Sequence, residues 1–178
     1  MKPHIKYGLI GAGILAAWSL VGFVMGNEMQ EKLKWVGYIV TFAVMIFCLR
    51  GAINDKKYFH NGFVSFKKAF GTAMLTSLIM WVVYSVFIFI YFKFINPELI
   101  PFMMDKAAEE MQNKGGMTDE QIEMGLKMQA KFMTPAIMSM FMFIWMMILS
   151  ILLSLIMASI LKKENPDGIF AEQTNQPS

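Results

Sequence analysis

Long uncharged runs alternate with short charged segments along the chain. Four of these runs approach the length of about 20 residues that a helix needs to cross a hydrocarbon core of about 30 Å. The predicted spans cover residues 7–26, 33–53, 69–92 and 135–161. Lys34 and Arg50 fall near the ends of the second span, where long side chains reach the headgroups. The pattern predicts an all-α fold, an integral membrane four-helix bundle.

The first run follows Lys2 and Lys6, so a cleaved signal peptide is the alternative to a retained span. Its apolar stretch exceeds the usual signal core of about 7–15 residues, and no small-residue cleavage site follows it. We therefore expect this span to be retained and residues 1–163 to form one four-span membrane domain.

Residues 96–133, between the third and fourth spans, carry the signals of two helices. Asn96 is placed as an N-cap with Pro97 at the first helical position, and Gly115–Gly116 ends this helix. Thr118 and Gln121 then have the spacing of a capping box. The pattern predicts an extramembrane helical hairpin between the third and fourth spans.

In the second helix of this hairpin an apolar stripe starts at Ile122 and continues through Leu126, Ala130 and Met133 toward the fourth span. Met117 and Ile122 stand at the positions of a hydrophobic staple. A half-apolar hairpin is expected to lie on the membrane surface or to fold over the bundle. Two interpretations stay open: the hairpin caps the outer ends of the third and fourth spans, or it also binds a partner protein or substrate.

Basic residues are denser on one side of the predicted bundle. Residues 50–68 hold five basic residues and one acid, whereas residues 93–134 hold five basic residues among seven acids. The two tails and the second loop together hold nine basic residues, against seven on the other side. The positive-inside rule places both termini in the cytoplasm, with residues 164–178 as a flexible cytoplasmic tail.

The second loop leads into the third span through a turn at Gly62 and an expected N-cap at Ser65. Basic residues at a helix start oppose its dipole, a cost that fits contact with anionic headgroups. We interpret the four lysines of this loop chiefly as orientation determinants. They are Lys56, Lys57, Lys67 and Lys68.

Composition agrees with a membrane protein, because 56% of the residues are hydrophobic and only 16% are charged, against about a quarter in soluble domains. The net charge of +3, without a basic stripe that carries aromatics, argues against nucleic acid as a partner. Cys48 is the single cysteine and is expected to pack as a small hydrophobe. The aromatic residues expected at the membrane interfaces are Trp35, Tyr38, Tyr91 and Phe92.

Candidate catalytic chemistry is sparse. The uncharged runs, the second of which covers Trp35 to Leu49 within its span, hold no Asp, Glu, Lys, Arg or His side chain, which argues against an intramembrane proton relay. His4 and His60 lack a second ligand at metal-binding spacing, and the acid pairs Glu109-Glu110 and Asp119-Glu120 occupy adjacent positions that do not face each other on a helix. We expect no catalytic, cofactor-binding or metal residues, no cofactor and no enzymatic activity.

Small residues recur at helical spacing in three spans, which permits close helix approach in lipid. They are Gly8, Ala12, Ala16 and Ser19, followed by a GxxxG at Gly22 and Gly26; Ala69, Ala73 and Ser77; and Ser150, Ser154 and Ala158. Such faces serve either packing inside one bundle, the favoured interpretation, or contact between copies. Seven methionines between Met133 and Met157 are interpreted as flexible apolar packing.

Two short motifs carry a family resemblance. "NGFVSFKKAF" at residues 61–70 enters the third span, and "INPEL" at residues 95–99 follows it, before a helical outer loop and a fourth span. From about Ile5 to Leu161 this layout resembles a membrane protein family of Bacteroidota known as domain of unknown function 4199. The resemblance implies a four-helix protein of a Gram-negative inner membrane and brings no site residues with it.

These observations favour a non-enzymatic accessory or interaction protein whose outer hairpin or basic cytoplasmic loop contacts a membrane protein partner. The alternative is a small oligomeric transporter or channel without an intramembrane charge relay. Its pathway would be lined by hydroxyl side chains, namely Thr72, Thr76, Ser150 and Ser154. The expected partners are the lipid bilayer, another membrane protein and further copies of this chain.

Overall fold

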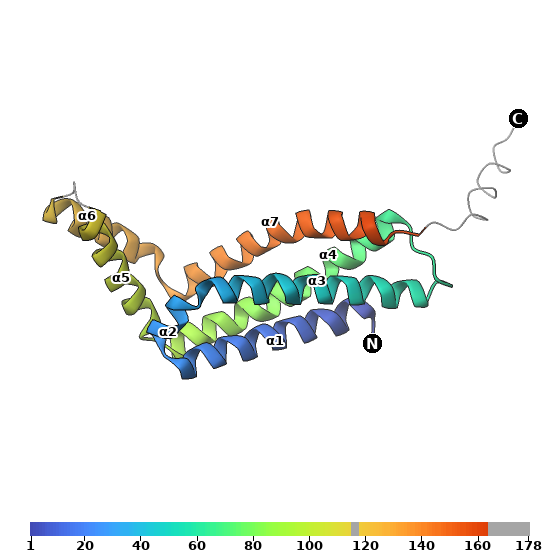
Figure 1. The fold of residues 1–178 in the computed structure, drawn as a ribbon, viewed down its shortest axis with the longest axis horizontal. Helices are drawn as coiled ribbons and strands as arrows, with labels where there is room; N and C mark the ends of the chain where they lie inside the picture. Colours follow the sequence, from blue (N-terminus) through green and yellow to red (C-terminus); the bar gives the residue numbers. More distant parts are fainter. Residues whose placement is uncertain (115–117, 164–178) are drawn as a thin grey trace, which may run out of the picture.

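A computed structural model describes residues 1–114 and 118–163. Within these residues lie α1 (Pro3–Met25), α2 (Asn27–Lys32), α3 (Lys34–Tyr58), α4 (Phe66–Ile90), a π-helix η1 (Tyr91–Ile95), α5 (Leu99–Lys114), α6 (Asp119–Phe132) and α7 (Pro135–Leu161). Helices α1, α3, α4 and α7 form an elongated bundle (Figure 1). In the sequence, α5 and α6 follow α4 and η1 and precede α7, and these two helices form a hairpin. The predicted all-α bundle with an extramembrane hairpin is confirmed.

Within the part of the chain that the structure describes, four helices are long and apolar enough to cross a membrane: α1, α3, α4 together with η1, and α7. The third extends three residues beyond its predicted end at residue 92, to Ile95. Lys93 does not stop it, because its ammonium lies 5.4 Å and 5.3 Å from the ring centres of Phe89 and Phe94. A lysine at a span end keeps its charge near water while its stem covers apolar surface.

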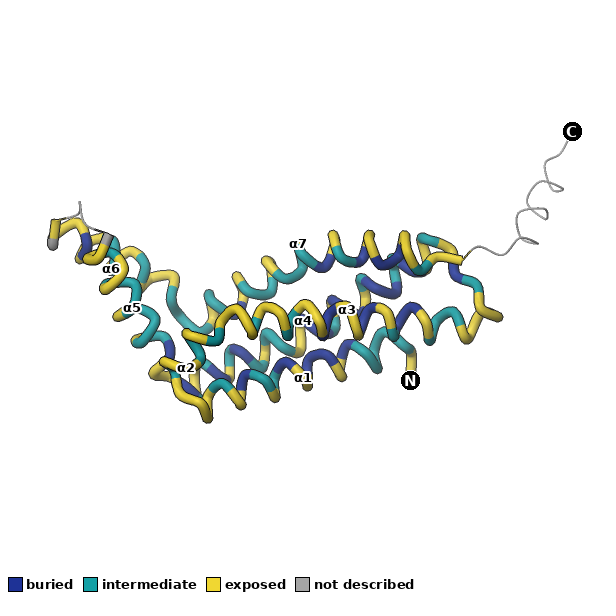
Figure 2. Tube along the Cα trace, viewed as in Figure 1, coloured by how far each residue is buried: buried dark blue, intermediate teal, exposed yellow. Residues whose placement is uncertain are grey.

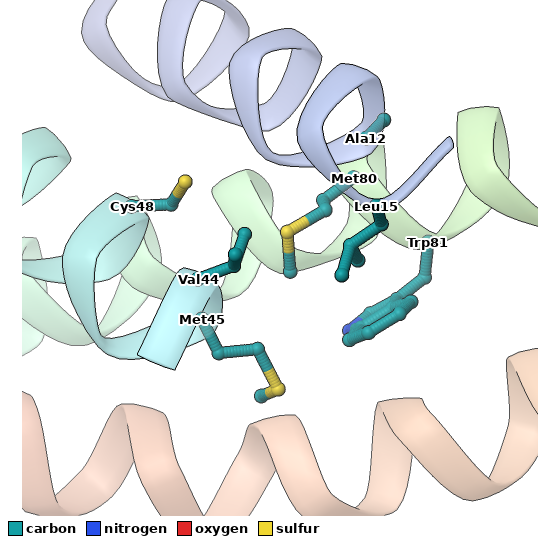
Figure 3. Packing of buried hydrophobic residues seen from close by; sticks show 7 residues of the cluster. All are labelled: Ala12, Leu15, Val44, Met45, Cys48, Met80 and Trp81. Carbon is teal, nitrogen blue, oxygen red and sulfur yellow. The ribbon is translucent and has the colours of Figure 1, made fainter. Parts of the chain in front are cut away.

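The middle of the bundle is a close-packed apolar core. Leu15 of α1, Met45 and Cys48 of α3, and Met80 and Trp81 of α4 are almost fully buried and point toward one another beside α7 (Figure 3). Cys48 packs as a small hydrophobe, as predicted. The Trp81 Nε1–H donates to Ser150 Oγ of α7 at 2.8 Å, which satisfies the one polar group of this indole.

Small residues let the helices approach inside one chain. Gly8, Ala12 and Ser19 are buried on α1, and the predicted small residues of α4 and α7 are buried too. Exposed positions recur along the outside of the four long helices (Figure 2). Many of them are large apolar residues, as expected of a protein surrounded by lipid.

The proposed GxxxG at Gly22 and Gly26 is wrong as a packing motif. Gly26 has a φ of 86° and ends α1, with no other atom within 4 Å of the position that a Cβ would take. Gly22 faces the side chain of Gln30 from the short helix α2. The same spacing therefore marks a helix end and a tight turn at this point of the chain.

Two of the three expected helix starts, Ser65 and Thr118, are confirmed at their positions. Thr118 and Gln121 form the complete capping box, with Gln121 N–H donating to Thr118 Oγ1 at 3.3 Å and Thr118 N–H to Gln121 Oε1 at 3.0 Å. Ser65 precedes α4 with an extended backbone but makes no side-chain capping bond. Three predictions lie outside the described residues: the helix end at Gly115–Gly116, the staple residue Met117, and the tail at residues 164–178.

Helices α5 and α6 project from one end of the bundle at a steep angle instead of folding over it (Figure 1). Much of their surface is exposed or half-exposed (Figure 2). In the first turn of α5, next to the bundle, Leu99 is buried.

Candidate functional site

The turn between α3 and α4 is hydrogen-bonded to the residues that follow α7. Asn61 and Gly62 have φ angles of 53° and 84°, so Gly62 provides the expected turn. Val64 and Lys163 then exchange two backbone hydrogen bonds of 2.8 Å and 2.9 Å. The "NGFVSFKKAF" motif therefore closes one end of the bundle.

The same end gathers the basic residues. Lys56 and Lys57 lie in the last turn of α3, where positive charge suits the helix dipole, and Lys67 and Lys68 are exposed in the first turn of α4. Lys6 pairs with Asp55 at 3.1 Å. Because the N-terminus lies here too, as Figure 1 shows, one end of the molecule presents a concentrated positive surface.

The two histidines remain apart from any metal-binding arrangement. His60 is exposed, and its Nδ1 lies 3.1 Å from the carbonyl oxygen of Lys56. Residues 1–114 and 118–163 hold no group of three or more His, Cys, Asp or Glu side chains that could bind a metal ion.

The hydroxyl side chains suggested for a pathway are buried between helices of one chain. Thr72 and Thr76 donate to the carbonyl oxygens of Lys68 and Thr72 at 2.8 Å each. Ser150 accepts the indole N–H of Trp81, and Ser154 is fully buried. A pathway along these four side chains would therefore require the packed helices of the protomer to separate.

The end of the bundle that carries the hairpin contains a buried polar contact. Asn96 Nδ2 donates to Asn27 Oδ1 at 2.8 Å and to the Tyr91 hydroxyl at 3.2 Å. The predicted capping role of Asn96 is wrong, because α5 begins only at Leu99 and the Asn96 side chain is turned into the protein. Tyr91 is likewise buried rather than placed at the lipid surface.

Beside this contact lies a cavity of about 360 Å³. Residues of α1, α2, α3, α4, α5 and α7 line it, so it forms only where the bundle meets the hairpin. Its lining includes Trp18, Tyr84 and Met146, and also Glu31 and Lys34, two half-exposed residues that pair at 2.6 Å. The amino-acid sequence alone does not predict this cavity. The local feature that could have pointed to it is the mixed charge of the short segment between the first two spans.

The hairpin leaves a stripe of large apolar side chains exposed on α6. Met124, Met128 and Phe132 recur every four residues and are 64%, 62% and 55% exposed. We refer to Met124, Met128 and Phe132 as the α6 stripe.

The facing helix α5 carries an ion pair. The hydrogen bond from Lys106 to Glu109, together with the charge of that carboxylate, raises the pKa of Lys106.

The bundle and its surface define the class of this molecule: an all-α integral membrane protein with four spans and an extramembrane helical hairpin. The chain belongs to the family described as Protein of unknown function (DUF4199), whose model matches residues 6–163. No curated protein and no solved structure matches the chain.

Proposed function

We propose that this protein is a non-enzymatic accessory protein of a membrane, which contacts another membrane protein through its projecting hairpin. The observation that carries the proposal is the α6 stripe. Three large apolar side chains on one helical face, each more than half exposed, form a surface of the kind that buries against a partner. They lie outside the four membrane-spanning helices, so bilayer burial within a span does not account for them.

We further propose that the protein resides in the inner membrane of a Gram-negative bacterium, as the resemblance to a family of Bacteroidota suggests, with both termini in the cytoplasm. The gathering of Lys56, Lys57, Lys67 and Lys68 at the end opposite the hairpin supports this orientation. In this orientation the hairpin lies on the outer side of that membrane.

Site-specific photo-cross-linking in the native cell tests the hairpin as a binding surface. A photoreactive residue in place of Met128 is expected to capture one reproducible membrane protein. The matched control replaces Ala130, which is exposed on a different face of the same helix, two residues or about 200° away. A partner captured at Met128 and not at Ala130 supports the proposal.

The same experiment separates the two candidate functions. Cross-links only between copies of this chain would overturn the proposed accessory role and favour the oligomeric transporter or channel, for which flux in liposomes containing this protein alone is the next measurement. The absence of any protein cross-link at Met128 would overturn the hairpin as a protein-binding surface.

A further inference from the structure

The start of α4 and the end of α7 meet at one corner of the bundle, at the end opposite the hairpin (Figure 1). Val64, two residues before α4, and Lys163, two residues after α7, exchange main-chain hydrogen bonds of 2.8 Å and 2.9 Å. The ammonium of Lys163 lies 5.4 Å from the centre of the Phe63 ring. The main chain therefore holds the two elements together, independently of the charges on their side chains.

This corner brings together exposed lysines from both elements. They are Lys67, Lys68, Lys162 and Lys163, which we call the lysine corner. In the part of the chain that the structure describes, ion pairs form at other lysines: Lys6, Lys34, Lys106 and Lys127. Ammonium groups on adjoining elements repel one another, and those at the start of α4 also oppose its helix dipole. A bound anion would relieve both costs.

The position of the lysine corner along the spans indicates the source of such an anion. Phe66 and Leu161 are the end residues of two membrane-spanning helices, so the corner lies where the hydrocarbon layer gives way to headgroups. Phe66 stacks on Phe70 with ring centres 6.2 Å apart, and both rings are only partly buried, as is Leu161. Accessible apolar surface therefore continues from the lysines into the span, where an acyl chain can lie.

We propose that the lysine corner binds one phospholipid with an anionic headgroup. Its phosphate lies among the ammonium groups of the α4 start and the α7 end, and one acyl chain follows the partly buried rings of Phe66 and Phe70. The lipid links α4 to α7 beside the two hydrogen bonds between Val64 and Lys163. An acidic segment of another protein matches the lysines but not the apolar surface next to them.

Native mass spectrometry of the purified protein in detergent tests the choice of headgroup. The probes are phosphatidylglycerol and phosphatidylcholine with identical acyl chains, so the two lipids differ in net charge. We expect the wild-type protein to retain phosphatidylglycerol at least tenfold better, because each lysine near an anionic headgroup contributes about fivefold in affinity. Equal retention of the two lipids would overturn the proposal and favour an acidic segment of a partner protein as the occupant.

A charge-matched pair of variants tests the place of binding. Lys162→Gln with Lys163→Gln removes two charges from the lysine corner and keeps the bonds to Val64, because these are formed by main-chain atoms. The preference for phosphatidylglycerol is expected to fall at least fivefold. The control, Lys56→Gln with Lys57→Gln, removes two charges from the last turn of α3 at the same end of the bundle and should change the preference less than twofold. Equal losses in both variants would overturn the corner as a site, because the basic end as a whole would then attract the lipid.

Glycerol phosphate distinguishes a lipid from a free phosphate as the occupant. It carries the phosphate group without acyl chains, so at the concentration of the lipid it is expected to leave phosphatidylglycerol bound. Displacement of half or more of the lipid under these conditions would overturn the assignment to a lipid, because the chain would then contribute nothing.

Discussion

At the scale of single residues, the absence of a side chain at Gly8 sets the distance between α1 and α4. A Cβ at this position would lie 2.8 Å from Ile79 Cγ2 and 3.1 Å from the Thr76 carbonyl oxygen. Ile79 Cβ would lie at 2.9 Å and is bonded to the main chain, so rotation of the Ile79 side chain cannot relieve the overlap. In lipid, where packing rather than the hydrophobic effect holds helices together, this close approach contributes directly to stability.

Gly8→Leu is therefore expected to destabilise the bundle by about 1–3 kcal/mol, the usual cost of overpacking a well-packed site. Reversible unfolding in mixed micelles, followed by circular dichroism, measures the change. The control is Gly13→Leu, whose side chain points into open space and should leave the midpoint nearly unchanged. Equal midpoints for the two variants would show that the α1–α4 contact does not limit stability.

The sequence predicted residue environments best where one residue type has one common role. Burial of Cys48 and of the small residues of α4 follows from their places in apolar runs. Gly26 and Asn96 were assigned wrongly, because glycine serves both helix contacts and helix ends, and asparagine serves both caps and buried contacts. The choice between these roles depends on tertiary neighbours that spacing does not reveal.

At the scale of elements, the "INPEL" segment joins the last turn of the third span to the hairpin. Asn96 bonds Tyr91 on its own side and Asn27 of α2 on the other, so it fixes the start of α5 against the turn between the first two spans. Since α5 and α6 otherwise project from the bundle (Figure 1), we expect this contact to help hold the hairpin in place.

Asn96→Ala is expected to raise the amide hydrogen exchange of residues 99–114 roughly tenfold, since it removes two hydrogen bonds that each contribute about 0.5–1.5 kcal/mol. The exchange of α1 and α4 should not change. Asn113→Ala, at an exposed position of α5, is the control. If both variants exchange alike, the hairpin is held by the apolar contacts of its first turn and not by Asn96.

Most of the helices could be predicted from the sequence, though from different features of it. The four long helices follow from uncharged runs, and the start of α6 follows from a capping box that is a local motif. The six-residue α2 was missed because so short a helix has no periodicity to detect. The cavity was missed because its lining comes from six helices, and their relative placement is a property of the tertiary fold.

At the scale of the whole molecule, the two ends differ in charge. The end with the N-terminus gathers the lysines of the α3–α4 turn beside a single acid, Asp55. At the other end, lysines of the hairpin are interspersed with acids and form pairs such as Lys106–Glu109 and Lys127–Glu123. This asymmetry links the sequence pattern to the orientation of the protein in the bilayer.

Replacement of the four turn lysines by glutamine is therefore expected to disturb orientation or insertion. The variant carries Lys56→Gln, Lys57→Gln, Lys67→Gln and Lys68→Gln, and a reporter active only in the cytoplasm, fused to the C-terminus, should lose several-fold in signal per inserted chain. The control replaces four hairpin lysines in the same way: Lys106, Lys114, Lys127 and Lys131. It should keep the signal, because it lowers positive charge only at the end of the molecule that carries the hairpin. Unchanged signal in the first variant would show that the turn lysines do not orient the bundle, and would leave anionic headgroup binding as the role of this surface.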